Sequence, residues 1–436
     1  MQRPKIFQII VISIFVTLLI LGFLAFSGKI PLPKGADEVN YGSVTVWGTI
    51  SMDIMNKLIA EKVSNQKQVS ITYVEKKADQ INQDFIEALA RGAGPDIIIL
   101  SQDNILKNLD KLSIIPYKMF SERDFKSTFL EGGEIFLDTT GIIAIPFTLD
   151  PLVMYWNRDM FTNARVSAPP KIWDDFYNLV PKITSRDDRG TITKSLISFG
   201  EYRNVNHAKE IVSLLMMQAG SPIVSKQGDV LIPQLIFRGN LNKENPTENA
   251  LRFFTEFAKT DKAAYSWNRS LPFSRMMFES GDLAIYIGYA SEYQSIQKKN
   301  PHLNFDVTVV PQLEQTPTKI TFGKMESLAL VKSSKNPQGS LFATLFLSSK
   351  DTVSYLSSVM NLPPIRRDLI SSTPTNAVQT VFYDSAFIVR AWRDPSPRET
   401  DTMFMKMIES ITSGRSTITE ALQVAQEVIE RLIINN

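Results

Sequence analysis

The residue types that most often carry chemistry in enzymes are scarce in this chain. Histidine occurs only twice, at His207 and His302, and cysteine is absent. Cysteine nucleophiles, thiolate zinc sites and disulfide bonds are therefore excluded, and a histidine-rich metal site is not expected. A serine–histidine pair would have to use one of these two histidines, and neither lies in a recognisable hydrolase motif. The sequence thus predicts no catalytic residues, no metal and no cofactor.

Composition describes a large globular protein. The 436 residues suffice for about two to three domains. The chain has 47 Lys and Arg residues against 45 Asp and Glu residues, and this balance argues against a nucleic-acid-binding surface. With 44% hydrophobic residues, the chain can build sizeable cores without disulfide bonds.

The amino end carries the strongest membrane signal. An uncharged, mainly apolar run spans residues 6–26, and a helix of this length reaches about 30 Å, roughly one hydrocarbon core. Arg3 and Lys5 precede the run and favour a cytoplasmic amino terminus. We expect a signal anchor or transmembrane helix over residues 1–28, with the rest of the protein on the extracytoplasmic side of the cell membrane.

A cleaved signal peptide is the alternative for this segment. Small residues at Ala25 and Ser27 offer a cleavage site before Gly28. The apolar run is longer than a usual signal core, which favours the uncleaved anchor. Residues 29–40 combine prolines, glycines and mixed charges, and they indicate a short tether.

Beyond the tether, strand and helix patterns alternate. Continuous apolar segments such as residues 97–100 are typical of parallel strands that are covered on both faces. Amphipathic helices separate them, and the chain ends in such a helix over residues 417–433. The fold class is therefore α/β.

Seven short motifs follow one another along the chain. They are the strand VTVWGT at 44–49, GPDII at 94–98, IPF at 145–147 with Asp150, MYWNRDMF at 154–161, PPKIWDDF at 169–176, FESGDLAI at 278–285 and SKNP at 334–337. In this order they resemble the extracellular solute-binding proteins of ABC importers, specifically the maltose-binding-protein-like, sugar-binding type. The resemblance covers nearly the whole chain from about residue 41. Its departures are Ile172 in place of threonine, Trp156 in place of tyrosine, and Asp282-Leu283 in place of Lys-Ala.

The resemblance implies a periplasmic-binding-protein-like fold of two α/β lobes joined by a hinge. We expect the chain to cross the hinge near Asp150, Pro311 and Pro363. The expected N-lobe comprises 41–150 plus about 312–362, and the expected C-lobe comprises 151–311 plus about 363–436.

The same resemblance implies a function in binding, not catalysis. We expect a monomeric, membrane-anchored receptor that captures a sugar or oligosaccharide between its lobes and delivers it to the permease subunits of an ABC transporter. Aromatic rings would stack on the sugar, and polar side chains would bond its hydroxyls. The alternatives are a module that binds or senses another solute (a polyamine, an anion or a peptide) without transport, and a glycoside-acting enzyme with paired carboxylates.

Ligand contacts are assigned by matching segments to the family. They come from the loop after the first strand, the loop after Leu100, the hinge, the polar loop 201–207, the end of the strand that reaches Gly288, and the carboxyl-terminal part. The candidates are Trp47, Thr49, Ser51, Met52, Ser101, Asp103, Asn104, Asp150, Asn204, Tyr289, Ser291 and Trp392.

Several candidates have a structural alternative. Trp47 and Trp392 could pack in a core. Asp103 could cap a helix. Asp150 could pair with Arg158.

Overall fold

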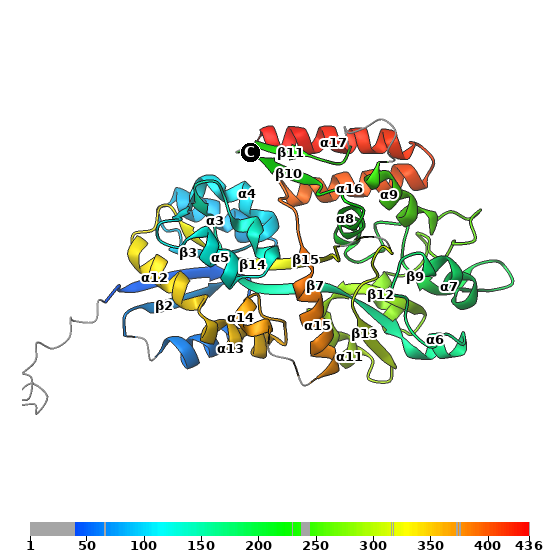
Figure 1. Cartoon of the computed structure of the whole chain (residues 1–436), viewed down its shortest axis with the longest axis horizontal. Coiled ribbons are helices and arrows are strands. Elements are labelled where there is room, and N and C mark those ends of the chain that lie inside the picture. The colour runs from blue at the N-terminus through cyan, green and yellow to red at the C-terminus, as the bar shows by residue number, and fades with distance from the viewer. Residues whose placement is uncertain are drawn as a thin grey trace, which may run out of the picture.

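The computed structural model describes residues 40–64, 67–228, 230–236, 245–314, 316, 318–371, 374 and 376–435. They form two α/β lobes that lie side by side (Figure 1). The expected signal anchor at 1–28 and nearly all of the tether at 29–40 lie outside the described residues. In the part of the chain that is described, no helix combines the length and the apolar character needed to cross a bilayer.

A single sheet extends through both lobes, in the order β2-β1-β3-β14-β7-β12-β9-β8. In the N-lobe, β1 (Ser43–Gly48) pairs in parallel with β2 (Ser70–Glu75) and β3 (Ile97–Ser101). Every residue of β3 is buried, as its continuous apolar sequence predicts.

Two long strands join the lobes. Strand β7 (Ile145–Asn157) runs from the N-lobe into the C-lobe (Figure 1), and its first half pairs antiparallel with β14 (Thr321–Val331). Its second half pairs with β12 (Leu283–Tyr289) and β13 (Phe305–Thr308). Strands β9 (Ile192–Ile197) and β8 (Ser185–Arg186) extend the C-lobe part of the sheet.

Short strands and helices complete each lobe. The remaining short strands are β4 (Leu112–Ser113), β5 (Ile115–Pro116), β6 (Gly141–Ile142), β10 (Val224–Gln227), β11 (Val230–Pro233) and β15 (Val389–Arg390). Between residues 52 and 218, the helices are α2 (Met52–Leu58), which continues as a π-helix (Ile59–Val63), α3 (Ile81–Ala90), α4 (Ile105–Asn108), α5 (Glu122–Thr128), α6 (Arg158–Asn163), α7 (Asp175–Ile183) and α8 (Ala208–Gln218). Between residues 246 and 434, the helices are α9 (Pro246–Glu256), α10 (Ser274–Glu279), α11 (Tyr293–Lys299), α12 (Pro337–Leu347), α13 (Lys350–Met360), α14 (Arg367–Ile370), α15 (Ala377–Phe387), α16 (Pro397–Thr412) and α17 (Ile418–Ile434).

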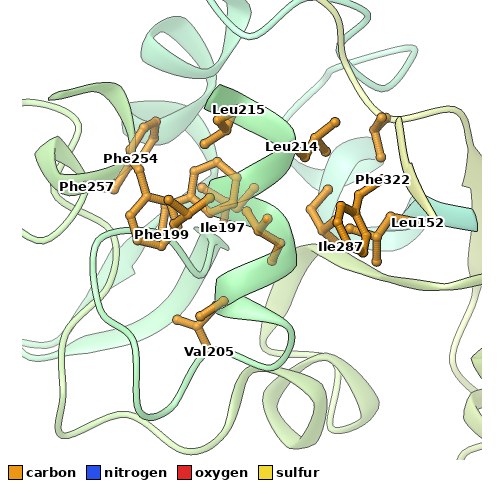
Figure 2. Packing of buried hydrophobic residues seen from close by; sticks show 14 of the residues in the cluster. Leu152, Ile197, Phe199, Val205, Leu214, Leu215, Phe254, Phe257, Ile287 and Phe322 are labelled. Carbon is orange, nitrogen blue, oxygen red and sulfur yellow. The ribbon is translucent and has the colours of Figure 1, made fainter. Parts of the chain in front are cut away.

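Each lobe has its own hydrophobic core. In the C-lobe, the buried helix α8 lies between an aromatic group and residues of the central strands (Figure 2). The aromatic group contains Phe199, Phe254 and Phe257, and the strand residues include Leu152, Ile287 and Phe322. This packing fixes α8 against the strands that lead to the other lobe.

Membership of the two cores shows where the chain changes lobes. One change falls between Leu149 and Leu152, near the expected Asp150, and a second falls between Phe322 and Met325, later than the expected Pro311. Beyond Leu356 the membership alternates, because Leu362 and Phe382 belong to the C-lobe core, whereas Ile365, Ile370, Ala386 and Val389 belong to the N-lobe core. We propose the first two places as lobe boundaries and a third between Leu356 and Trp392, a range that includes the expected Pro363.

Hydrogen bonds explain why the second change of lobe comes later than Pro311. The backbone N–H of Gln312 donates to the carbonyl of Lys171, and the side chain of Gln312 bonds Val310 and Ile320. These contacts keep the segment after Pro311 on the C-lobe until β14 begins. Such long-range bonds leave no periodic signal in the sequence.

Candidate functional site

An inner cavity of about 230 Å³ lies between the lobes. Its wall combines residues of the N-lobe, of β14 and of the C-lobe. The lining residues are Gln102, Asp103, Lys209, Glu210, Ser213, Tyr289, Phe322, Lys324, Trp392 and Asp394.

A second cavity, here called the wider cavity, has a volume of about 610 Å³. One wall is formed by α3 together with Asn104 and Lys107, and the other by Ser396, Pro397 and Arg398. Asn104 follows Asp103 and Ser396 lies two residues after Asp394, so neighbouring residues of the chain line the two cavities.

Strand ends and helix starts supply the polar groups of the inner cavity. Strand β3 ends at Ser101, and a 3₁₀ turn (Gln102–Asn104) follows it. Tyr289 ends β12, and Lys209 and Glu210 lie in the first turn of α8. Carboxyl ends of parallel strands are the usual ligand-binding edge of open α/β sheets.

The carboxyl-terminal wall is held by a buried network. The ammonium of Lys209 lies 2.5 Å from the Asp394 carboxylate and 2.9 Å from the Thr400 hydroxyl. The indole N–H of Trp392 donates to Ser213 at 3.2 Å. Burial raises the pKa of Asp394, and the nearby Lys209 partly opposes this shift. The network therefore fixes the Trp392 ring in the cavity wall, where the residue is only 4% exposed and also belongs to the C-lobe core, as its structural alternative predicted.

A second network positions Tyr289. The Glu292 carboxylate accepts hydrogen bonds from the Tyr289 N–H at 3.2 Å and the Tyr286 hydroxyl at 2.7 Å, and it lies 2.5 Å from the His207 ring. Burial alone would raise the pKa of Glu292, but these hydrogen bonds and the His207 charge outweigh it and lower the pKa. The His207 ring packs edge-on to the Tyr289 ring with centroids 4.8 Å apart. Tyr289 is therefore held from both its backbone and its ring.

Asp150 lies on β7 where the chain leaves the N-lobe core. Its carboxylate accepts a hydrogen bond from the Ser291 N–H at 3.0 Å, and in the sheet it is paired with Lys324. Burial raises the pKa of Asp150 to about 6, although the hydrogen bonds from Ser291 act in the opposite direction. The carboxyl group can therefore change protonation in mildly acidic solution.

The structure brings three of the predicted residues together in the inner cavity. Asp103, Tyr289 and Trp392 all line it, and Asn104 lines the wider cavity. Asp150 and Ser291 are bonded to each other beside β14. In the described part of the chain, Asp103 makes no capping hydrogen bond, and Asp150 makes no ion pair with Arg158, the structural alternatives that the sequence left open.

The loop after β1 lies elsewhere. Trp47, Thr49, Ser51 and Met52 line neither of the two cavities. Both β3 and β14 separate β1 from the strand that enters the C-lobe. The Trp47 ring faces the ammonium of Lys76 at 4.0 Å. Strand order, which the sequence pattern does not specify, places these residues away from the inner cavity.

Two further predicted residues have structural contacts. Asn204 is only 7% exposed, and its amide donates to the carbonyls of Asn268 and Leu271 and accepts from the Trp267 indole. These bonds occupy the side chain, so we remove Asn204 from the candidate site. Ser101 is buried, and its hydroxyl accepts a hydrogen bond from Asn104, which positions the turn behind the cavity.

Sequence reasoning missed the contribution of α8. The polar loop 201–207 was expected to reach the ligand, but the helix that follows it lines the cavity through Lys209, Glu210 and Ser213. These residues share one face at helical spacing in an otherwise apolar helix. That interruption of the apolar pattern is the signal that could have identified them.

Comparison with known proteins places the chain in a family. A profile of the bacterial extracellular solute-binding proteins matches residues 58–380. The chain belongs to this family.

Individual relatives are distant. The chain is 21% identical to the diacetylchitobiose binding protein DasA of Streptomyces coelicolor over 421 residues, 91% of this chain and 92% of that protein. It is 20% identical to a binding protein of Brucella abortus over 280 residues, which is only 63% of the length of either protein. A solved cyclic alpha-maltosyl-1,6-maltose binding protein from Arthrobacter globiformis has a TM-score of 0.74 at 14% identity and covers 90% of this chain and 99% of its own. These relatives are named as binding proteins, and the structural likeness establishes the two-lobed fold.

Proposed function

We propose that this protein is a carbohydrate-binding receptor that captures a sugar or oligosaccharide between its two lobes. One observation carries the proposal: both lobes contribute to a single cavity that combines aromatic rings, Tyr289 and Trp392, with carboxylate and amide side chains. Rings of this kind stack on the apolar face of a sugar, while carboxylates and amides bond its hydroxyl groups.

The position of the cavity links binding to a change in shape. A ligand that contacts both lobes stabilises the arrangement in which the lobes lie close together. Strands β7 and β14 carry the chain between the lobes, so changes in their backbone angles near Asp150 and Gly323 would move one lobe relative to the other. The receptor thereby signals occupancy through its shape.

Family and relatives support this function. DasA is named for diacetylchitobiose and the Arthrobacter protein for a cyclic maltosyl-maltose. We infer an extracytoplasmic location, anchoring through residues 1–28, a monomeric state and delivery of the bound sugar to an ABC transporter permease. The anchor would hold the receptor near its permease and raise its effective concentration there.

The test is a thermal-shift screen against mono- and oligosaccharides, with amino acids, polyamines and phosphate as competing ligand classes. A ligand of the folded state raises the melting temperature in proportion to the logarithm of its concentration over Kd. We expect a shift with one class of sugars. A shift only with polyamines, amino acids or phosphate would overturn the carbohydrate proposal.

Matched variants locate the binding. Tyr289→Ala removes the stacking ring and should abolish most of the sugar-induced shift, whereas Tyr289→Phe retains the ring and should preserve most of it. Phe273→Ala is the control, because Phe273 is an exposed aromatic residue of the same lobe (54%) and lines neither cavity. Equal shifts in wild type and Tyr289→Ala would exclude the inner cavity as the site.

A further inference from the structure

Ionisable groups dominate the inner cavity. Three acids line it, Asp103, Glu210 and Asp394, together with two lysines, Lys209 and Lys324. A neutral sugar needs hydrogen-bond partners, but it does not need an excess of one charge. The balance among these groups therefore bears on the class of ligand.

Both lysines are already committed to acids of the protein. Lys209 bonds Asp394 at 2.5 Å, and Lys324 lies 3.4 Å from Glu326, whose charge is the main cause that raises the pKa of Lys324. Within each of these two pairs, the positive and the negative charge neutralise each other. Neither lysine compensates a further carboxylate at bonding distance.

Two acids of the cavity wall have no ion-pair partner among the described residues. Among the residues that the structure describes, neither Asp103 nor Glu210 forms an ion pair, and Oδ1 of Asp103 is wholly buried and accepts no hydrogen bond. A buried acceptor without a partner is costly, so a ligand group that donates to it is expected. Since Asp103 lines the inner cavity, we expect a ligand donor on this side of it.

The charges of Asp103 and Glu210 both act on the region around Tyr289. Burial raises the pKa of the Tyr289 hydroxyl far above its ordinary value, and the charges of Glu210, Asp150 and Asp103 raise it further. The two lysines of the wall are paired with Asp394 and Glu326, and His207 and Arg275 are both bonded to Glu292. The region between the lobes is consequently electronegative.

The surroundings fit an organic cation better than a metal ion. In the described chain, no group of three or more histidine, aspartate or glutamate side chains is arranged to hold a metal. An aromatic ring here already faces an ammonium, since the Lys209 Nζ lies 5.4 Å from the centre of the Trp392 ring. A ligand ammonium beside Tyr289 would combine carboxylate and aromatic contacts in the same way.

We propose that the inner cavity recognises a protonated amine, so that the bound carbohydrate is an amino sugar or an oligosaccharide with a free amino group. This inference rests on the carbohydrate-binding function proposed above. The amine donates to Asp103 Oδ1 and lies within the field of Glu210, while the rest of the sugar contacts Tyr289 and extends toward the wider cavity.

Isothermal titration calorimetry at neutral pH tests the inference with two sets of sugars that differ only at carbon 2. One set is glucose, glucosamine and N-acetylglucosamine, and the other is cellobiose, the glucosamine disaccharide chitobiose, and diacetylchitobiose. We expect the amine to bind about tenfold or more tightly than its hydroxyl and acetamide counterparts, because one desolvated charge pair is added. Raising the ionic strength should reduce this advantage.

Charge-neutralising variants connect the preference to the cavity. Asp103→Asn and Glu210→Gln keep the shape of each side chain and should each remove most of the preference for the amine. Glu427→Gln, on the exposed surface of α17, is the control and should leave it unchanged. A preference that survives in both cavity variants would overturn the assignment of these acids.

The outcomes separate this inference from the proposed function. Neutral sugars that bind as tightly as the amines would overturn the recognition of a cation and leave the carbohydrate receptor intact. A protein that binds none of these sugars and none in the wider screen would overturn the receptor proposal, and the inference would fail with it.

Discussion

Replacement of Asp150 by asparagine should make the protein more stable at neutral pH. Burial raises the pKa of this carboxyl group from its ordinary value of 3.8 to about 6. The folded protein therefore disfavours the charged form, and Asp150→Asn removes that charge while its side-chain oxygen can still accept the hydrogen bond from Ser291.

The sign and size of the effect follow from proton linkage. Below about pH 4, Asp150 is protonated in both the folded and the unfolded protein and has no effect on stability. Between about pH 4 and pH 6 the unfolded chain ionises first, and above about pH 6 the folded protein carries the unfavourable charge. A pKa difference of about 2 units corresponds to about 3 kcal/mol of destabilisation at neutral pH.

Differential scanning calorimetry across this pH range measures the effect. The entropy of unfolding is about 2.1 cal/mol/K per residue, so 3 kcal/mol corresponds to about 3 °C in the Tm of a chain of this length. We expect Asp150→Asn to melt about 3 °C above wild type near pH 7 and at the same temperature near pH 4. Asp53→Asn, at an exposed position of α2, is the control and should show no such pH-dependent difference.

Two results would refute this reasoning. A difference in Tm that is the same at every pH would show that the asparagine acts through packing and not through the charge. A variant that is less stable than wild type at neutral pH would show that the carboxylate is favourable in the fold.

Three other substitutions test the fold and the site. Gly323→Ala should lower the free energy of unfolding by about 1–3 kcal/mol in urea titrations, because its Cβ would lie 2.6 Å from a methyl group of Val389; an unchanged midpoint would contradict this close contact. Trp392→Phe breaks the hydrogen bond to Ser213 and should raise the Kd for sugar in calorimetry, whereas an unchanged Kd would remove this ring from the site. Asn204→Ala should cost about 1–3 kcal/mol of stability, since it leaves buried polar groups unpaired, and should leave the Kd unchanged; a large loss of affinity would restore Asn204 to the site.

Local patterns were sufficient to predict some of the elements. The apolar run of β3 predicts a strand that is covered on both faces, and its burial agrees. Helix α17 begins at Ile418 and is capped by Thr417, whose side chain forms a capping box with that of Glu420. Both signals act within a few residues of the chain, so the sequence displays them directly.

Non-local pairing could not be predicted in the same way. Strand β7 serves both lobes, and its partners β14 and β12 come from distant parts of the sequence. The place where the chain changes lobes depends on these pairings and on bonds such as that between Gln312 and Lys171. The family resemblance gave the two-lobed architecture and a change of lobe near Asp150, but not the later position of the second change.

Two of the predicted residues that line the inner cavity lie where a central strand ends. Asp103 follows β3 and Tyr289 ends β12, and both lie beside the strands that join the lobes. Trp47 follows the same local rule, but β1 lies farther from the C-lobe in the sheet. The contributions of Lys209 and Glu210 depend on how α8 packs, which local sequence does not determine.

The most direct test of the central claim is a crystal structure of the protein with the tightest-binding sugar from the screen. We predict density for the sugar between the lobes, in contact with Tyr289 and Trp392 and within hydrogen-bond distance of Asp103. Sugar bound outside the interlobe cavities, for example in the C-lobe pocket beside Tyr177 and Phe253, would contradict the account.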